Sequence, residues 1–236
     1  MGRRLIKEGT LFSEKYVIIV AGGKGDRMKA DIPKQFLLLN GLPILMHTIN
    51  AFDNYDSTIE IIVVLPESQK DYWQELCERY QFNRSHTVVS GGMTRFHSVQ
   101  NALNLIPEGV LVAIHDGVRP LVSKELLSKL FEAAKTSNVA CPAIPVTDSI
   151  RKKMGDASKR VDRSQYRLMQ TPQIFLSNYI KDAYKQDYTD LFTDDLSVLE
   201  GSRYCRPLLL EGSPENIKIT TPIDLIIAEA ILKCRI

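Results

Sequence analysis

Short apolar runs rich in β-branched residues recur along this chain, and they restrict its fold more than any other feature. Five of these runs are predicted strands, at residues 16–20, 61–65, 87–89, 110–114 and 139–144. The segments between them are predicted helices, several with apolar residues at helical spacing, at residues 42–52, 68–80, 95–104 and 124–136. Continuous apolar strands are typical of parallel sheets that are covered on both faces. The alternation therefore predicts a doubly wound, mostly parallel α/β sheet whose ligand crevice lies at the carboxyl ends of its strands.

The bulk composition is that of an ordinary globular protein. The chain has 236 residues, 44% of them hydrophobic and 25% charged, which predicts a single domain over residues 15–236 after a flexible N-terminal extension over residues 1–14. The formal net charge of +2 gives no strong field, so neither nucleic acid nor a membrane is an expected partner. The four cysteines form no Cys-x-x-Cys pair, and we find no signal peptide and no run long enough to cross a bilayer. A cytoplasmic location is therefore expected.

The loop after the first predicted strand is rich in glycine. It contains Ala21, Gly22, Gly23, Gly25 and Arg27. Glycines allow backbone amides to approach an anion closely, and Lys34 adds a second cation a few residues later. No Gly-Lys-Ser/Thr triplet follows, and Met28 stands where a dinucleotide fingerprint has its third glycine. The loop suits a triphosphate, although a simple tight connection remains the alternative.

The segment between Pro145 and Pro172 has a different character. It carries charged residues on both sides of a turn-like Met154-Gly155-Asp156. This pattern predicts a polar hairpin that leaves the main body, a protruding β-arm over residues 146–166. A solvated surface loop is one interpretation, and an arm that packs on a second subunit is the other.

A series of motifs resembles the signature of the sugar-phosphate cytidylyltransferases and has the same order. The motifs are Gly22-Gly23-x-Gly25-x-Arg27-Met28, Pro33-Lys34-Gln35-Phe36, Gly91-Gly92-x-x-Arg95-x-x-Ser98-Val99, His115-Asp116-Gly117-Val118-Arg119-Pro120, Asp162-Arg163, Gln170-Thr171-Pro172-Gln173-x-Phe175, Thr193-Asp194-Asp195 and Glu215-Asn216-Ile217-Lys218-Ile219-Thr220. They extend from about Val17 to Glu229, which is most of the chain. The resemblance implies a Rossmann-like nucleotidyltransferase fold and an enzyme that transfers CMP from CTP to a polyol phosphate.

Two neighbouring families share this pattern. One acts on 2-C-methyl-D-erythritol 4-phosphate in isoprenoid precursor synthesis and releases pyrophosphate, and the other acts on ribitol 5-phosphate. The Thr193-Asp194-Asp195 and Val161-Asp162-Arg163 motifs look more like the first family. Gly22 and Gly117 stand where that family commonly has alanine, so ribitol 5-phosphate remains an alternative acceptor. A catalytically silent CTP sensor and a nucleotidyltransferase for another base or acceptor are further alternatives.

The resemblance also implies a role for individual residues. Catalysis is assigned to Arg27, Lys34, Arg163 and Lys218. Nucleotide binding is assigned to Ala21, Gly22, Gly23, Gly25, Gly91, Gly92, Arg95, Ser98, Asp116 and Gly117. Acceptor binding is assigned to Arg119, Ser149, Arg163, Thr171, Thr193 and Lys218. Mg²⁺ or another divalent cation is expected with Asp116 as its protein carboxylate, and a homodimer is implied in which Arg163 and Ser149 of the arm reach the neighbouring subunit's site.

Four of the motif residues have a simpler interpretation. Asp116 could be an N-cap or turn acid, and Arg95 could be a surface cation at a helix N-terminus. Lys218 lies in an alternating Ile-Lys-Ile-Thr run that resembles a half-exposed strand. His115 is expected to be structural, because no serine or cysteine stands beside it in a hydrolase motif.

Overall fold

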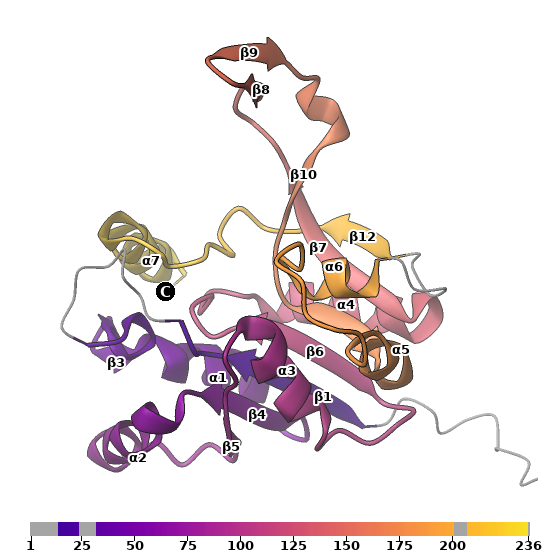
Figure 1. Ribbon diagram of the computed structural model, residues 1–236. Helices are drawn as coiled ribbons and strands as arrows, with labels where there is room; N and C mark the ends of the chain where they lie inside the picture. The colour runs from indigo at the N-terminus through magenta and orange to yellow at the C-terminus, as the bar shows by residue number, and fades with distance from the viewer. Residues whose placement is uncertain (1–13, 24–31, 201–206, 236) are drawn as a thin grey trace, which may run out of the picture.

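A central sheet organises the computed structural model, which describes residues 14–23, 32–200 and 207–235 (Figure 1). Its strand order is β10-β7-β11-β6-β1-β4-β5, and β12 also pairs with β7. The strands are β1 (Lys15–Val20), β4 (Glu60–Leu65), β5 (Thr87–Ser90), β6 (Leu111–Asp116), β7 (Val139–Pro145), β10 (Arg167–Met169), β11 (Gln173–Leu176) and β12 (Leu208–Glu211). The pairs β1/β4, β1/β6, β4/β5 and β7/β12 are parallel. The predicted mostly parallel α/β sheet is confirmed.

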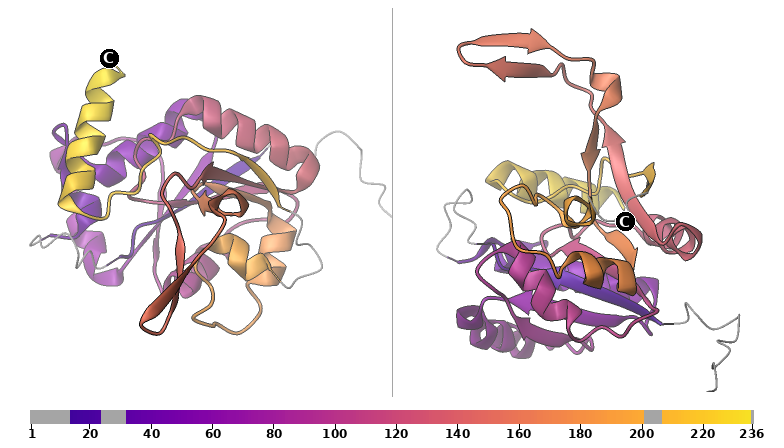
Figure 2. Two further views of the ribbon diagram at one scale, coloured as in Figure 1. Left: turned by 90° about the horizontal axis from the view of Figure 1, so that it is seen from above. Right: turned by 45° about the vertical axis from the view of Figure 1, so that its right-hand side comes forward.

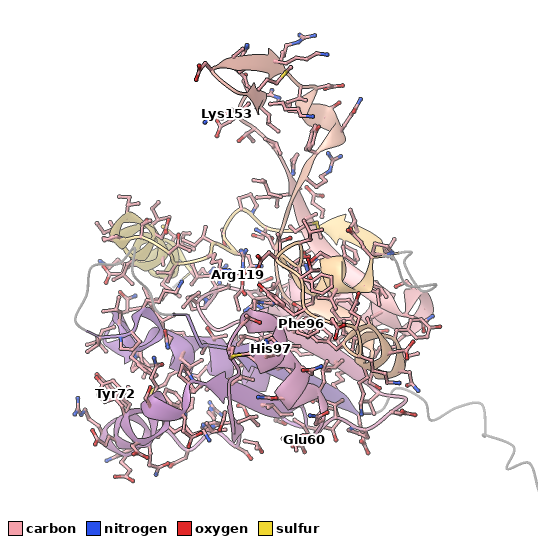
Figure 3. The ribbon with its side chains drawn as sticks, in the orientation of Figure 1. Glu60, Tyr72, Phe96, His97, Arg119 and Lys153 are labelled. Atoms are coloured by element: carbon pink, nitrogen blue, oxygen red, sulfur yellow. The ribbon has the colours of Figure 1, made fainter. Side chains whose placement is uncertain are left out.

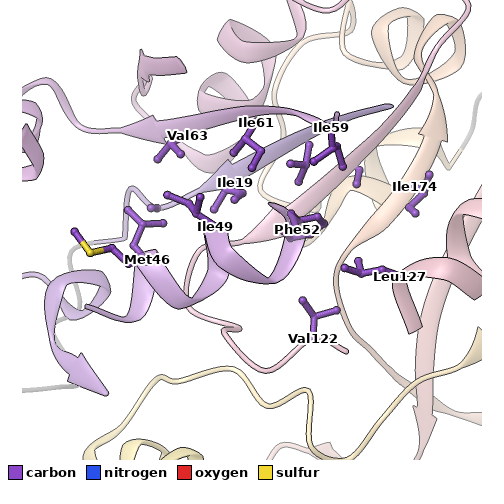
Figure 4. Close-up of a cluster of buried hydrophobic side chains, with 14 of the residues drawn as sticks. Ile19, Met46, Ile49, Phe52, Ile59, Ile61, Val63, Val122, Leu127 and Ile174 are labelled. Carbon is purple, nitrogen blue, oxygen red and sulfur yellow. The ribbon is translucent and has the colours of Figure 1, made fainter. Parts of the chain in front are cut away.

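Helices cover both faces of this sheet, as its apolar strands require. They are α1 (Ile44–Tyr55), α2 (Lys70–Arg79), α3 (Arg95–Leu103), α4 (Lys124–Ser137), α5 (Ser177–Ala183) and α6 (Asp195–Leu199). The last helix, α7 (Pro222–Cys234), belongs to a separate cluster, in which Ala228 is buried with Leu39 and Ile44. On one face α1, α2 and α4 bury a cluster that includes Ile19, Phe52 and Leu127 (Figure 4). On the other face α3, α5 and α6 pack on the opposite side chains of the same strands. Among the described residues, no helix is long and apolar enough to cross a membrane.

Some predicted boundaries and environments were wrong. The helix predicted at 42–52 begins at Ile44, because residues 42–43 form a short strand, β3 (Leu42–Pro43), against β2 (Leu38–Leu39). The strand predicted at 87–89 is not fully buried, because Thr87 is exposed and the rest of β5 is half-buried. β5 is also an edge strand that pairs only with β4. The antiparallel strand β11, which the sequence pattern did not predict, lies between β6 and β7.

The register of the parallel strands brings the predicted loops to one edge of the sheet. Val20 of β1 is level with Asp116 of β6, and Leu65 of β4 is level with Ser90 of β5. Further backbone hydrogen bonds continue the ladder beyond the strands: the Ala21 amide donates to Val64, and the Gly117 amide donates to Val20. The carboxyl ends of β1, β4, β5 and β6 therefore place their loops around one crevice.

A hairpin rises from the body between β7 and β10. We call residues 146–166 the arm; it contains β8 (Arg151–Met154), β9 (Ala157–Arg160) and the 3₁₀ turn η4 (Arg163–Gln165). Every residue from 151 to 160 is exposed, and the arm extends away from the sheet in Figure 1 and in the right-hand view of Figure 2. The predicted N-terminal extension lies outside the described residues, apart from Glu14.

Candidate active site

Two adjoining cavities lie at the carboxyl edge of the sheet. The first has a volume of about 280 Å³ and includes these predicted residues in its lining: Ala21, Gly22, Gly23, Lys34, Gly92, Arg95, Ser98, Asp116 and Lys218. The second has a volume of about 250 Å³ and includes Arg95, Asp116, Arg119, Thr171, Thr193 and Lys218. Arg95, Asp116 and Lys218 line both cavities, so this charged group forms their junction.

Asp116 is the centre of the junction. Its side chain is only 10% exposed, and three cations surround it: Lys218 Nζ at 3.0 Å, Arg119 Nε at 3.2 Å and Arg95 Nε at 3.7 Å from the nearest carboxylate oxygen. Burial raises the pKa of Asp116, but the nearby Arg95, Lys218 and Arg119 lower it by more. The resulting pKa of Asp116 is well below its usual value. Asp116 is therefore ionised throughout the neutral range, and it is the last residue of β6 rather than an N-cap.

Lys218 does not lie on a strand, so the half-exposed strand that its sequence pattern suggests is wrong. Residues 217–220 have no regular secondary structure. The segment is instead tied to the loop after β6, because the Ile219 amide donates to the Val118 carbonyl. Ile219 is buried against Leu39 and Ile44, and its neighbour Lys218 points to Asp116.

A series of hydrogen bonds between uncharged, buried groups supports the backbone of Asp116. The Asp116 amide donates to Thr171 Oγ1 at 3.0 Å, and the same hydroxyl lies 3.1 Å from His115 Nδ1. His115 Nε2 lies 3.0 Å from the Arg119 carbonyl, which can only accept. The partners are all satisfied if His115 carries its proton on Nε2 and accepts from Thr171 at Nδ1. Complete burial lowers the pKa of His115 to about 4, so the ring is neutral and structural, as predicted from the sequence.

Arg95 is not the surface cation that its position at a helix N-terminus allows. Its side chain is 30% exposed, and its two terminal nitrogens donate to the carboxylate of Asp195 at 2.8 and 2.6 Å. Asp195 itself is fully buried at the start of α6 and also accepts from the Tyr184 hydroxyl at 2.7 Å. The sequence prediction gave no role to Asp195 or Tyr184. The adjacent acids of the Thr193-Asp194-Asp195 motif were the available signal.

The second glycine loop is folded tightly over the start of α3. Ser98 Oγ accepts from the Gly92 amide at 3.1 Å and donates to the Thr94 carbonyl at 2.9 Å. A Cβ at Gly92 would lie 2.4 Å from His97 Cβ, and one at Gly91 would lie 3.0 Å from Ser98 Oγ. The loop therefore requires glycine for close approach, and Ser98 holds its shape in the wall of the first cavity.

Gln35 is a further residue that the sequence prediction did not assign to the site. It is 1% exposed and lines the first cavity beside Lys34. Its amide nitrogen donates to the Ala21 carbonyl at 2.7 Å and to Gln69 Oε1 at 2.6 Å. Gln35 thus fixes the beginning of the first glycine loop, and its place in the Pro33-Lys34-Gln35-Phe36 motif was the signal.

Other predicted residues do not line the cavities. Gly91 and Gly117 lie behind the walls, and a Cβ at Gly117 would lie 2.9 Å from Ala21 Cβ, so this glycine allows two loops to pack. Ser149 and Arg163 belong to the arm and line neither cavity of this chain, where Arg163 donates to the Thr147 carbonyl. Figure 3 illustrates the separation: Lys153 lies at the arm's end, whereas Arg119 lies in the body. Gly25 and Arg27 lie outside the described residues.

The donor set at the junction fits one kind of metal site. Among the residues that the structure describes, no group of three or more His, Cys, Asp or Glu side chains is placed to hold an ion. Mg²⁺ is commonly bound through one or two carboxylates together with the phosphates of a substrate. A single ionised carboxylate, Asp116, at the boundary of two cavities fits an ion held mainly by phosphates and does not fit a cage made of protein ligands.

Comparisons with known proteins agree with this geometry. The family model described as IspD, 2-C-methyl-D-erythritol 4-phosphate cytidylyltransferase, matches residues 16–234. The enzyme of that name from Azobacteroides pseudotrichonymphae is 54% identical, with 93% of this chain and 99% of the relative covered. The one from Phocaeicola vulgatus is 51% identical, with 92% and 99% covered.

Solved structures give the same result. The crystal structure of 4-diphosphocytidyl-2C-methyl-D-erythritol synthase from Anaerococcus prevotii superposes with a TM-score of 0.79 at 28% identity, covering 93% of this chain and 96% of that one. The crystal structure of 2-C-methyl-D-erythritol 4-phosphate cytidylyltransferase from Thermus thermophilus has a TM-score of 0.76 at 31% identity, covering 93% and 99%. The chain therefore belongs to the 2-C-methyl-D-erythritol 4-phosphate cytidylyltransferase family.

Proposed function

We propose that this chain transfers CMP from CTP to 2-C-methyl-D-erythritol 4-phosphate in isoprenoid precursor synthesis. The products are 4-diphosphocytidyl-2-C-methyl-D-erythritol and pyrophosphate. The observation that carries the proposal is the pair of cavities joined at Arg95, Asp116 and Lys218. Two compartments that share one charged junction can hold two phosphorylated substrates with their reacting phosphates close together.

The chemistry is a direct displacement. A phosphate oxygen of the acceptor attacks the α-phosphorus of CTP, a new P–O bond forms, and the bond from that phosphorus to the bridging oxygen of the β-phosphate breaks. Pyrophosphate leaves with the electron pair of that bond. The protein supplies no nucleophile, so its contribution is the positioning of the two substrates and the neutralisation of the charge of the transition state.

The cations at the cavities divide this work. Lys34 lines the first cavity at the glycine loop and is assigned to the triphosphate, together with Arg27. Lys218 lies at the junction and is assigned to the transferred phosphoryl group and to the phosphate of the acceptor. Arg119, whose guanidinium is held by Asp116 and by the Asn216 carbonyl at 2.8 Å, faces the acceptor's side.

We extend the proposal to a divalent cation, most simply Mg²⁺, held by the phosphates of CTP with Asp116 as its protein carboxylate. When bound, such an ion neutralises part of the phosphate charge. Asp116 keeps its negative charge among three cations, so at neutral pH it is in the ionised form that a metal ligand requires.

We also propose a homodimer in the cytoplasm, in which Arg163 and Ser149 complete the second cavity of the neighbouring subunit. The support is geometric: Arg163, Ser149 and most of the arm are exposed, and within one chain neither residue lines the two cavities formed by the described residues. Arg163 is a cation, and the second cavity is the compartment assigned to the acceptor's phosphate. This proposal predicts that acceptor binding depends on the dimer more than CTP binding does.

Pyrophosphate release by the purified protein tests the function. The assay contains CTP and Mg²⁺ and compares 2-C-methyl-D-erythritol 4-phosphate with ribitol 5-phosphate, and it then replaces CTP with UTP, GTP and ATP. We expect rapid release only with CTP and the methylerythritol acceptor. A preference for ribitol 5-phosphate would keep the mechanism and change the acceptor. CTP binding without release with either acceptor would favour the silent sensor.

A further inference from the structure

We infer that Asp195 is a positioning residue, which holds the guanidinium of Arg95 at the junction of the two cavities, and that Tyr184 fixes Asp195 in turn. The inference rests on the proposed function, since Arg95 is the group that meets the substrates. Asp195 itself lines neither cavity.

The contact between Asp195 and Arg95 is bidentate. Nη1 of Arg95 donates to Oδ1 at 2.8 Å and Nη2 donates to Oδ2 at 2.6 Å. A planar guanidinium held by two parallel hydrogen bonds cannot turn without breaking both. Arg95 begins α3 and Asp195 begins α6, so the pair also joins two helices that are 100 residues apart in sequence.

The Nε of Arg95 faces the junction. It lies 3.7 Å from Asp116 Oδ1, and the side chain is 30% exposed in the walls of both cavities. A guanidinium has five N–H donors, and the contact with Asp195 uses two of them. Arg95 can therefore bind a phosphate oxygen while Asp195 holds it, and it need not reorganise when substrate arrives.

Tyr184 supports the carboxylate from the protein interior. Its hydroxyl donates to Asp195 Oδ1 at 2.7 Å, and its ring is stacked on Phe96 with centroids 4.6 Å apart. Burial and the neighbouring carboxylate of Asp195 raise the pKa of Tyr184 well above its usual value. The hydroxyl therefore stays protonated and donates throughout the neutral range.

The turn before α6 is itself tied to the sheet. Gln173 of β11 donates through Nε2 to Asp194 Oδ2 at 2.6 Å and accepts from the Leu196 amide at 2.8 Å. Thr193 and Asp194 line the second cavity. The same fixed turn therefore forms part of the second cavity and presents Asp195 to Arg95, which explains how a residue outside both cavities can act on the junction.

The test compares Asp195→Asn with the wild-type protein in two assays: kcat/KM for CTP with 2-C-methyl-D-erythritol 4-phosphate, and CTP affinity by calorimetry. Asparagine keeps the shape of aspartate but replaces one accepting oxygen with an NH₂ group. This NH₂ group would face a donor of Arg95, so the guanidinium must move. We expect kcat/KM to fall about a hundredfold, the loss that a displacement of about 1 Å can cause. Asp182→Asn, which removes a surface ion pair with Lys185, is the matched control and should leave both values unchanged.

A double-mutant cycle separates positioning from general structural support. If Asp195 acts through Arg95, then Arg95→Gln with Asp195→Asn should be no worse than Arg95→Gln alone, because the positioned group is already gone. Losses that multiply, to about ten-thousandfold, would overturn the inference, as would wild-type kinetics for Asp195→Asn. The melting temperature of each variant is measured in parallel, since breaking a buried ion pair can destabilise the fold.

Tyr184→Phe keeps the proposal testable if the charge variants do not fold. Phenylalanine keeps the stack on Phe96 and removes only the hydroxyl. We expect a loss of about fivefold in kcat/KM, and none for Tyr188→Phe, whose hydroxyl contacts the exposed Asp190. Equal effects in the two variants would contradict the assignment. A wild-type protein that binds CTP but transfers nothing would refute the proposed function alone. Calorimetry would then still test the inference, which predicts weaker CTP binding in Asp195→Asn and unchanged binding in Asp182→Asn, because Arg95 lines the first cavity.

Discussion

The junction of the two cavities and the arm both carry basic residues assigned to phosphates, but they differ in how those residues are held. At the junction, Asp116 is 10% exposed and gathers three cations within 3.7 Å. On the arm, every residue from 151 to 160 is exposed. One chain is therefore enough to fix the charges of the junction, whereas the arm has no comparable set of partners within its own chain.

This difference has a physical consequence for binding. Groups that are held before the substrate arrives lose little conformational entropy on binding, whereas groups on an exposed hairpin must first be ordered by a partner. We therefore expect the nucleotide site to tolerate changes in the arm. The acceptor site should be sensitive both to the junction and to the arm.

Lys218→Ala should have the largest effect, since it removes a cation from the junction itself. We expect kcat/KM to fall about a hundredfold or more, as for the loss of one preorganised electrostatic donor. Steady-state kinetics with both substrates varied checks this value. Lys185→Ala, which removes an exposed lysine, is the control. If Lys218→Ala lost less activity than Arg163→Ala, the comparison between junction and arm would be reversed.

His115 should make the folding stability of the protein sensitive to acid. Its pKa is lowered to about 4 in the folded state, so the unfolded chain takes up a proton first as the pH falls below the ordinary value of 6.5. Stability is complete above pH 6.5 and decreases toward pH 4, by about 2 kcal/mol between pH 7 and pH 5. Burial also lowers the pKa of His47, which adds to this dependence of stability on pH.

Urea unfolding at a series of pH values measures this loss. Asp56, whose pKa is lowered to about 2, contributes only below its ordinary value of 3.8 and does not disturb the window. His115→Gln should have a shallower slope between pH 7 and pH 5. An equal slope in the variant would show that His115 is not the group responsible.

Arg163→Ala tests the contribution of the arm to acceptor binding. We expect kcat/KM for the acceptor to fall about tenfold or more, the value of a charge-assisted hydrogen bond, with CTP affinity unchanged. Arg160→Ala, on the same hairpin, is the matched control. Equal losses for acceptor and CTP would contradict the assignment of Arg163 to the acceptor.

Gly92→Ala should have the smallest of the four predicted effects. Its Cβ would lie 2.4 Å from His97 Cβ, so the loop must move, and we expect CTP affinity to fall about fivefold. At Gly22 the nearest atom to a Cβ is 3.9 Å away, so Gly22→Ala should weaken CTP much less. Calorimetric titration of both variants checks the order, and the reverse order would contradict the geometry of the first cavity.

The sequence predicted the parts of the fold that local pattern determines. The apolar runs of β1, β4 and β6 have enough β-branched residues to be recognised as buried strands. The short strand β11 has no such run, and its antiparallel position between β6 and β7 depends on pairing between distant segments. Local pattern also suggested a strand around Lys218, where tertiary contacts of Ile219 determine the conformation instead.

The site was predictable to the extent that its motifs follow strand ends. Asp116, Ser98 and Lys34 were assigned from the sequence and line the first cavity. Asp195 was not assigned, because its partner Arg95 lies 100 residues away in sequence and only the tertiary fold brings the two together. The Thr193-Asp194-Asp195 motif marked the position of Asp195, but a local pattern does not identify the residue with which it pairs.

If the proposed function is right, the two cavities hold the two halves of one product, with its diphosphate at the junction. A crystal structure with 4-diphosphocytidyl-2-C-methyl-D-erythritol should then show the cytidine beside Gly92 and Ser98 and the methylerythritol beside Thr193. The diphosphate should lie within hydrogen-bond distance of Arg95 and Lys218. A product bound with its diphosphate away from this junction, or with both halves in one cavity, would show that the two cavities are not the two substrate compartments.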